Sequence, residues 1–207
     1  MENPELKHIW KMRWTEKPFR VQFIVTFSLL SILLFSLSYF FAFVEARSGS
    51  KVHDVVLNLI SPYDLSVATF LLIYFAAILC IISLLNKPEL FLKAVQAYFI
   101  ILIFRIITLT LFPLEAPEGI ILLKDPFIEH FFYGKVRITK DLFFSGHVAT
   151  VCLLYLVNPV KKWNWFYLLV FILVALFIMI QRVHYSFDVL AAPVFAWVSW
   201  KLAKGIR

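Results

Sequence analysis

The chain has 207 residues, of which 62% are hydrophobic, and its mean hydropathy is +0.86. Soluble domains are about 45–50% apolar, so this composition excludes an ordinary water-soluble protein and indicates a membrane protein. The formal net charge of +7 does not indicate nucleic-acid binding, because the Lys and Arg residues cluster at the ends of apolar runs and form no stripe with interleaved aromatic residues.

Six apolar segments predict transmembrane helices, because a helix needs about 20 apolar residues to cross a bilayer. In chain order they are residues 21–44, 65–85, 91–112, 142–157, 165–183 and 188–203. The fourth segment is the shortest, and the short connections around the fifth imply helical hairpins. We therefore expect an all-α fold, namely a polytopic membrane protein with a six-transmembrane-helix bundle. Residues 1–207 are expected to form a single integral membrane domain.

The distribution of Lys and Arg predicts the orientation of the chain in the membrane. With six spans both termini lie on one side, and that side receives most of the basic residues near the helix ends. Cytoplasmic loops carry such an excess, so both termini are expected to be cytoplasmic. The longest connection, residues 113–141, is then exoplasmic, which means periplasmic in a bacterium or lumenal in a eukaryote. Two roles for it stay open, a lid over a site and a segment at the membrane interface.

Three ionisable residues are predicted to meet at one depth on the exoplasmic side. His147 lies one turn into the fourth segment, and His184 and Asp188 lie between the fifth and sixth. Such residues are costly at membrane depth and are usually functional. The spacing of four places Asp188 on the same helical face as His184, where a carboxylate fixes the tautomer of a nucleophilic histidine. Ser145 and Gly146 open a helix whose N–H groups suit an anion such as phosphate.

Two other interpretations of His147, His184 and Asp188 stay open. They can form a structural hydrogen-bond network that joins three helices, or they can bind a metal ion. No further ligand is convincingly placed for a metal, so none is expected. Single histidines near a membrane edge, such as His53 and His130, are more often interfacial than catalytic.

Two stretches resemble the catalytic motifs of the sphingomyelin synthase family, which belongs to the lipid phosphatase and phosphotransferase superfamily. They are Asp-Leu-Phe-Phe-Ser-Gly-His at residues 141–147 and His-Tyr-Ser-Phe-Asp at residues 184–188. The sequence from Phe104 to Leu114, which contains Arg105, is similar to that family's third-helix motif. Arg182 and the Phe-Phe-Ser-Gly-His-Val-Ala form also resemble the plant phosphatidylcholine:diacylglycerol cholinephosphotransferases. The resemblance spans residues 98–192.

The resemblance implies a two-step transfer of a phospho-head group between lipids. His184, oriented by Asp188, would attack a donor phospholipid, and His147 would protonate the leaving diacylglycerol and then activate an acceptor lipid alcohol. The partners are therefore a phospholipid donor, a lipid-alcohol acceptor such as ceramide or diacylglycerol, and the bilayer. No metal or organic cofactor is implied. The candidate substrate-binding residues are Ser145, Gly146, Arg105, Asp141, Tyr185 and Arg182.

Two alternative functions stay open beside this transferase. Lipid phosphate phosphatases of the PAP2 type share the Ser-Gly-His and His-x-x-x-Asp elements but carry further cations. This chain has no Arg-Pro dipeptide, and Ile178 occupies the position six before His184, where those enzymes have Arg. A phosphate monoester is nearly a dianion and needs more cations than a phosphodiester, so the sequence favours the transferase. A non-catalytic lipid-binding scaffold is the third possibility.

Overall fold

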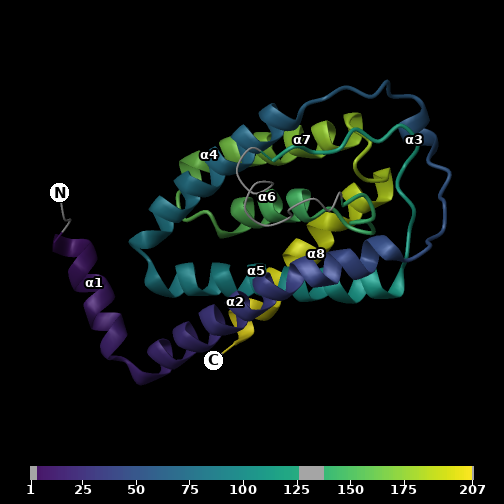
Figure 1. Cartoon of the computed structure of the whole chain (residues 1–207). Coiled ribbons are helices and arrows are strands. Elements are labelled where there is room, and N and C mark those ends of the chain that lie inside the picture. The colour runs from purple at the N-terminus through teal and green to yellow at the C-terminus, as the bar shows by residue number, and fades with distance from the viewer. Residues whose placement is uncertain (1–3, 126–137, 207) are drawn as a thin grey trace.

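A computed structural model describes residues 4–125 and 138–206. Within these ranges the regular structure is helical, and an isolated bridge between Ser50 and Leu114 joins two loops. The helices, shown in Figure 1, are α1 (Pro4–Thr15), α2 (Lys17–Ala46), α3 (Val55–Asn58), α4 (Ser66–Leu85), α5 (Pro88–Leu111), α6 (Gly146–Val157), the 3₁₀ helix η2 (Lys161–Trp163), α7 (Asn164–Ile180) and α8 (Ser186–Gly205). The predicted all-α fold is confirmed for the described residues.

Four helices of the described chain are long and apolar enough to cross a membrane. They are α2, α4, α5 and the stretch Lys161–Ile180 that contains α7. Helix α6 has only 12 residues, which is about 18 Å at about 1.5 Å per residue and shorter than a hydrocarbon core of about 30 Å. Helix α8 has 20 residues but is not among the four. The structure therefore supports an integral membrane protein, with four helices that meet both criteria where six spans were predicted.

The predicted fourth segment starts at residue 142, but helix α6 begins only at Gly146. The backbone conformation just before the helix explains the difference. Phe143 has a φ of 86°, a left-handed conformation that side chains other than glycine rarely adopt. The helix begins only after this residue, with Ser145 as its N-cap and Gly146 as its first residue. Residues 142–145 therefore form an irregular entrance to the helix. Irregular backbone at membrane depth is tolerated where protein surrounds it.

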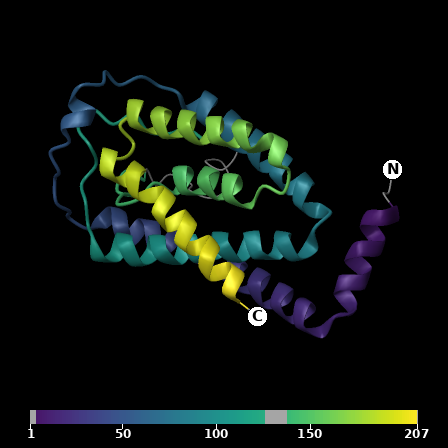
Figure 2. The ribbon, with the colours of Figure 1, turned by 180° about the vertical axis from the view of Figure 1, so that it is seen from behind.

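Helix α6 lies at the centre of the bundle. It contacts α4, α5, α7 and α8, and both ribbon views show it between these neighbours (Figures 1 and 2). Small side chains at the contacts allow the helix backbones to approach closely. Fully buried residues of this core include Val148, Ala149, Val174, Ile178, Ala192 and Ala196. Because protein rather than lipid covers α6, its short length does not expose backbone ends to the hydrocarbon.

Helix α1 was not predicted, and it lies against the end of the bundle that carries both termini (Figure 1). The indole Nε1 of Trp10 donates a hydrogen bond to the carbonyl of Leu85 over 2.7 Å. The same ring makes edge-to-face contacts with Phe19, Phe23 and Phe91. Trp10 thus fastens α1 to the junction between α4 and α5.

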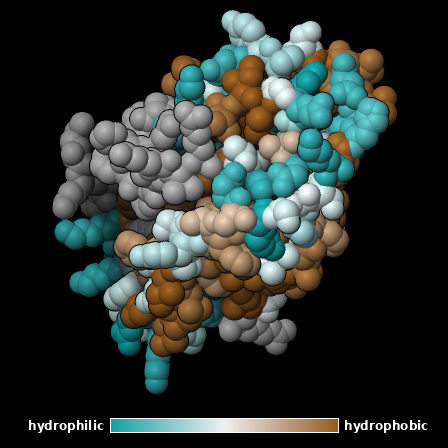
Figure 3. All heavy atoms as spheres, turned by 45° about the vertical axis from the view of Figure 1, so that its right-hand side comes forward, coloured by the Kyte–Doolittle hydropathy of each residue, from teal (hydrophilic) through white to brown (hydrophobic). Residues whose placement is uncertain are grey.

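Loops cover the opposite end of the bundle, where α3 also lies. The N–H of Ser50 donates to the carbonyl of Pro113 over 2.9 Å, and the N–H of Glu115 donates to the carbonyl of Ser50 over 3.0 Å. A Cβ at Gly49 would lie 2.5 Å from the carbonyl carbon of Leu114, so only glycine permits this close approach of the two loops. Figure 3 shows hydrophilic side chains gathered on the surface at this end, interspersed with apolar ones.

Candidate active site

The first turn of α8 holds a buried histidine–aspartate pair. Tyr185 is the N-cap, and Asp188 is the third residue of the helix. The Nδ1 atom of His184 lies 3.2 Å from Oδ2 of Asp188, and both side chains are buried. The same Oδ2 accepts the backbone N–H of Tyr185 over 3.1 Å. A carboxylate only accepts, so neutral His184 presents Nδ1–H to Asp188 and keeps the lone pair of Nε2 on its other side.

The start of α6 lies directly beside this pair. The backbone N–H of Ser145 donates to the carbonyl of Asp188 over 3.2 Å. Ser145 also caps α6, because its Oγ accepts the N–H of Val148 over 3.4 Å. The N-termini of α6 and α8 thus lie side by side. The structure brings together the two segments that carry the three predicted catalytic residues.

His147 is the second residue of α6 and follows Gly146. Its ring meets Phe70 of α4 edge-on, with centroids 5.7 Å apart. Its Nδ1 is buried without a hydrogen-bond partner in the part of the chain that the structure describes. The ionisable side chains close enough to influence it electrostatically include His184, Arg105 and Asp141. A half-buried imidazole with a free nitrogen is suited to exchange a proton with a bound ligand.

Arg105 of α5 binds the segment that leads into α6. Its guanidinium donates to the carbonyl of Phe144 over 2.8 Å and forms an ion pair with Asp141. It also lies 5.6 Å from the centroid of the Phe144 ring. Arg105 and Asp141 are therefore each other's partners, and contact of either residue with substrate stays a prediction.

Gly146 gives Arg105 the space for these contacts. A Cβ at this position would lie 2.6 Å from Nη1 and 2.7 Å from Cζ of Arg105. Gly146→Ala is therefore expected to displace the guanidinium and to destabilise the protein by about 1–3 kcal/mol. Thermal unfolding in detergent measures this. Gly205→Ala is the matched control, because nothing lies within 4 Å of a Cβ there, and an equal melting temperature for both variants would contradict the expectation.

Arg182 and Tyr185, two predicted substrate-binding residues, bind backbone groups of the covering loops. Arg182 has a φ of 56°, and its guanidinium donates to the carbonyls of Leu57, Ile60 and Glu118 at 2.8–3.0 Å. The hydroxyl of Tyr185 donates to the carbonyl of Glu115 over 2.9 Å. Both side chains therefore fasten loops beside His184, and a substrate contact for either stays a prediction.

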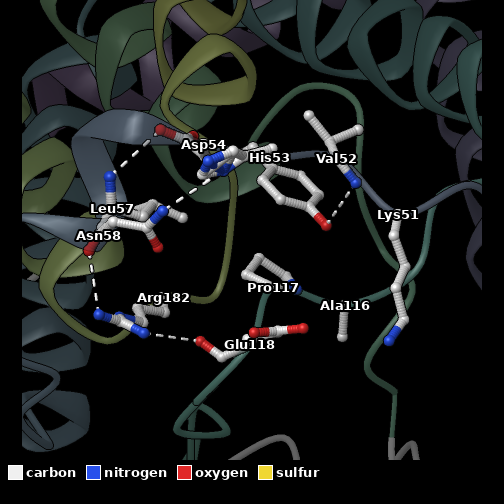
Figure 4. Close-up of a pocket in the computed structure, with 11 residues that line it drawn as sticks. Lys51, Val52, His53, Asp54, Leu57, Asn58, Ala116, Pro117, Glu118 and Arg182 are labelled. Atoms are coloured by element: carbon white, nitrogen blue, oxygen red, sulfur yellow. Dashed lines mark hydrogen bonds between the residues drawn. The ribbon is translucent and has the colours of Figure 1, made fainter.

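A cavity of about 310 Å³ opens among these loops (Figure 4). Its lining residues are Lys51, Val52, His53, Asp54, Leu57, Asn58, Ala116, Pro117, Glu118, Arg182 and Tyr185. His147 and His184 are not among them. The polar groups of Arg182 and Asp54 that face this region bind backbone atoms, so the cavity is distinct from the histidine site.

Asp54 is a residue of this region that sequence reasoning missed. One carboxylate oxygen accepts the N–H groups of Val56 and Leu57, and the other accepts the N–H of Ser186 over 2.6 Å. Burial raises the pKa of Asp54, but the hydrogen bonds from Ser186 and Leu57 outweigh burial and hold the pKa below its usual value. The Asp-Val-Val-Leu sequence signals an N-cap for α3, but nothing in the sequence signals the contact with Ser186.

The described residues contain no group of three His, Cys, Asp or Glu side chains placed to hold a metal ion. The donor set at the site is two imidazoles and one carboxylate whose Oδ2 is already engaged by His184 and Tyr185. The arrangement is suited to proton transfer and nucleophilic attack by histidine, since each ring keeps a nitrogen that is not tied to a carboxylate.

Comparison with known families gives one match. Residues 140–205 match the family model described as PAP2 superfamily C-terminal. The matched region contains α6, α7 and α8, and with them His147, His184 and Asp188. Searches of curated proteins and of solved structures found no match. The family match supports an enzyme of the lipid phosphatase and phosphotransferase superfamily, and it agrees equally with transfer and with hydrolysis.

Proposed function

We propose that this protein is a phospholipid head-group phosphotransferase. It moves a phospho-head group, such as phosphocholine or phosphoethanolamine, from a glycerophospholipid to a lipid alcohol, such as ceramide or diacylglycerol. The observation that carries the proposal is the buried hydrogen bond between His184 and Asp188 beside the N-terminus of α6. The pair leaves Nε2 of His184 as a nucleophile, and His147 stands at the adjoining helix start as a proton donor and acceptor.

In the first step, Nε2 of His184 attacks the phosphorus atom of the donor lipid. The bond from phosphorus to the diacylglycerol oxygen breaks, and that oxygen takes a proton from His147. The head-group phosphate is then bonded to His184. Asp188 stabilises the positive charge that develops on the ring, because its carboxylate is hydrogen-bonded to Nδ1.

In the second step, the hydroxyl of the acceptor lipid gives its proton to His147. Its oxygen attacks phosphorus, and the phosphorus–nitrogen bond to His184 breaks. Both histidines return to their starting protonation states, so the cycle consumes only the two lipids. The same geometry serves both steps because the donor and acceptor oxygens occupy the same side of the phosphorus in turn.

The N-terminus of α6 offers stabilisation for the phosphate oxygens. The first N–H groups of a helix have no acceptor within the helix, and the helix dipole favours an anion there. The Ser145 hydroxyl accepts the hydrogen bond from the N–H of Val148. The backbone N–H groups of Gly146 and His147 are then the candidate donors to the phosphate. Two N–H groups suit the single negative charge of a phosphodiester.

Hydrolysis by a PAP2-type phosphatase or a phospholipase C-like enzyme is the second candidate, with water in place of the acceptor alcohol. The nearby cationic side chains already bind other protein groups, which favours transfer over hydrolysis of a monoester. Arg105 pairs with Asp141, Arg182 binds backbone carbonyls, and Lys140 binds Glu115 and the carbonyl of Arg47. A phosphate monoester, which is nearly a dianion, needs several cations that are free to bind it.

The decisive experiment places the purified protein in liposomes that contain labelled phosphatidylcholine and phosphatidylethanolamine together with ceramide and diacylglycerol. A labelled head group on a new lipid supports the transferase and identifies donor and acceptor. Release of water-soluble phosphate or phospho-head group without a new lipid would replace the proposal by hydrolysis. No turnover with any of these lipids would favour the non-catalytic scaffold.

We further propose that α6 and α8 also lie at membrane depth, which gives six spans, and that both termini are cytoplasmic. Aromatic and basic residues support this orientation. Tryptophans mark membrane interfaces, and basic residues mark the cytoplasmic side. All six Trp residues lie on α1, around η2 or in the second half of α8, at the end opposite the histidine site: Trp10, Trp14, Trp163, Trp165, Trp197 and Trp200. The ammonium groups of Lys201 and Lys204 lie against two of these rings.

Single-cysteine labelling tests the orientation. In a background without Cys80 and Cys152, a cysteine replaces either the exposed Lys162 of η2 or the exposed Tyr63 in the loop before α4. In sealed right-side-out vesicles, a membrane-impermeant maleimide is expected to label Tyr63→Cys and to spare Lys162→Cys until detergent is added. The reverse pattern would invert the topology, and equal labelling would contradict opposite sides for the two positions.

A further inference from the structure

The N-cap residue of α8 does not cap the helix with its own side chain. Its N-cap is Tyr185, whose side chain makes no capping hydrogen bond. The first N–H groups of a helix need acceptors, and Ser, Thr, Asp or Asn at the N-cap normally supplies one. In this helix the Asp188 side chain accepts the N–H of Tyr185, which leaves the N–H of Ser186 in need of another acceptor.

Asp54 supplies the missing acceptor from a loop 132 residues earlier in the chain. Its Oδ2 accepts the N–H of Ser186 over 2.6 Å. Its Oδ1 accepts the N–H groups of Val56 and Leu57 over 3.0 and 3.2 Å, which caps α3. One carboxylate therefore caps two helices, and the dipole of the 20-residue helix α8 favours its negative charge.

The residues around His184 hold the segment 52–60 at three points. Arg182 donates to the carbonyl of Leu57 in α3 (Figure 4). It also donates to the carbonyl of Ile60 just after that helix. The hydroxyl of Tyr185 accepts the N–H of Val52 over 3.4 Å. Together with the hydrogen bond between Ser186 and Asp54, these contacts join the residues on both sides of His184 to the segment 52–60. The position of His184 therefore depends on a loop outside the region that matches the family model.

We propose that Asp54 is a positioning residue for the His184–Asp188 pair and acts as the external N-cap of α8. It acts through the backbone of Ser186, so it touches neither the reacting atoms nor the His184 ring. The first turn of α8 carries Asp188, and the bond from Asp188 to Nδ1 of His184 sets the direction of Nε2. Release of Ser186 loosens that turn and misaligns the nucleophile. The catalytic part of this inference rests on the proposed role of His184.

Asp54→Asn separates the two capping roles of the carboxylate. Asparagine is as good an N-cap as aspartate, so its single carbonyl oxygen can still cap α3. Its amide nitrogen then faces the N–H of Ser186, and two donors cannot bond. We expect kcat to fall about tenfold or more with KM unchanged, because misplacement of a reacting group acts on the chemical step. We also expect hydrogen exchange of the backbone amides at 185–188 to rise about tenfold, since the first turn opens more often.

Glu118→Gln is the matched control. It makes the same change from carboxylate to amide at an exposed residue that lines the same cavity. It is expected to keep the kcat and the amide exchange of the unchanged protein. A comparable fall in kcat with Glu118→Gln would overturn the proposal, because the effect would then follow from the lost charge.

Ser186 allows a test from the other side of the hydrogen bond. Ser186 is the first residue of α8, where proline is well tolerated and removes only an N–H that the helix does not use. Ser186→Pro is expected to lower kcat as much as Asp54→Asn does, and Asp54→Asn is expected to add no further loss in that background. Ser186→Ala keeps the N–H, so its kcat is expected to stay well above that of Ser186→Pro.

The exchange measurement needs no substrate, so it separates this inference from the proposed function. If the unchanged protein turns over no lipid, the proposed function fails, while the exchange at 185–188 still tests whether Asp54 caps α8. Unchanged exchange in Asp54→Asn, or independent losses in the two single variants that add in the double variant, would overturn the inference. A rise in KM alone would overturn the positioning role.

Discussion

Replacing His184 with alanine is expected to reduce the rate of head-group transfer by at least about 10³-fold, because loss of the nucleophile in a catalytic unit costs this much or more. The buried hydrogen bond to Asp188 fixes the orientation of the His184 ring, as the proposed role requires. Without this nucleophile, no covalent intermediate is expected. The measurement is the initial rate of labelled lipid product in liposomes, together with acid-labile label on the protein after brief exposure to a donor labelled in its phosphate.

His8→Ala is the matched control for this experiment. His8 is an exposed residue of α1, at the opposite end of the bundle, so its removal is expected to leave the rate within about twofold of the unchanged protein. A His184→Ala protein that retains more than about a tenth of the original rate would rule out attack by this residue. A lipid-binding scaffold would tolerate both changes equally.

Arg105→Leu is expected to destabilise the protein by about 2–3 kcal/mol, because it removes the buried partner of an ion pair whose carboxylate is half-buried. The change strands the carboxylate of Asp141 and the carbonyl of Phe144, both of which the guanidinium binds. Leucine is close to the size of the aliphatic part of arginine, so loss of packing contributes less than loss of the bonds. Chemical denaturation in detergent measures the free energy of unfolding.

Two further variants show whether the ion pair is the cause. Arg105→Lys keeps the charge but lacks the fork that reaches both oxygen acceptors, so intermediate stability is expected. Adding Asp141→Leu to Arg105→Leu removes the stranded carboxylate, and the double variant is expected to be more stable than Arg105→Leu alone. If Arg105→Leu unfolds at the same denaturant concentration as the unchanged protein, the ion pair does not stabilise the entrance to α6.

The long apolar runs predicted most of the helices because lipid requires continuous apolar segments. Helices α2, α4, α5 and α7 lie close to the predicted segments at residues 21–44, 65–85, 91–112 and 165–183. The polar helix α1 gave no such signal, since its stability comes from contacts of Trp10 with the bundle. The start of α6 was also missed, because the left-handed conformation of Phe143 arises from tertiary contacts.

The contact between His184 and Asp188 was predicted from their spacing of four residues, and the structure has it. The expected reason was helix periodicity, but His184 precedes α8, and Asp188 reaches back to it from the first turn of that helix. The closeness of the α6 N-terminus, which carries His147, to the start of α8 followed from the alternation of helix direction. The contacts of Arg182 and Asp54 were not predictable, because they join irregular loops whose sequences carry no periodicity. The chemical roles of all these residues stay predictions until turnover is measured.

The shared carboxylate of Asp54 bears on whether the family-matched region is a module. Residues 140–205 contain every motif residue of the histidine site, but the acceptor for the Ser186 N–H belongs to a loop far outside that region. An excised fragment would therefore contain the proposed catalytic residues but lack the acceptor that orders the start of α8. If Asp54 positions His184 as we propose, two chains with identical residues 140–205 are expected to differ in activity when they differ at residue 54.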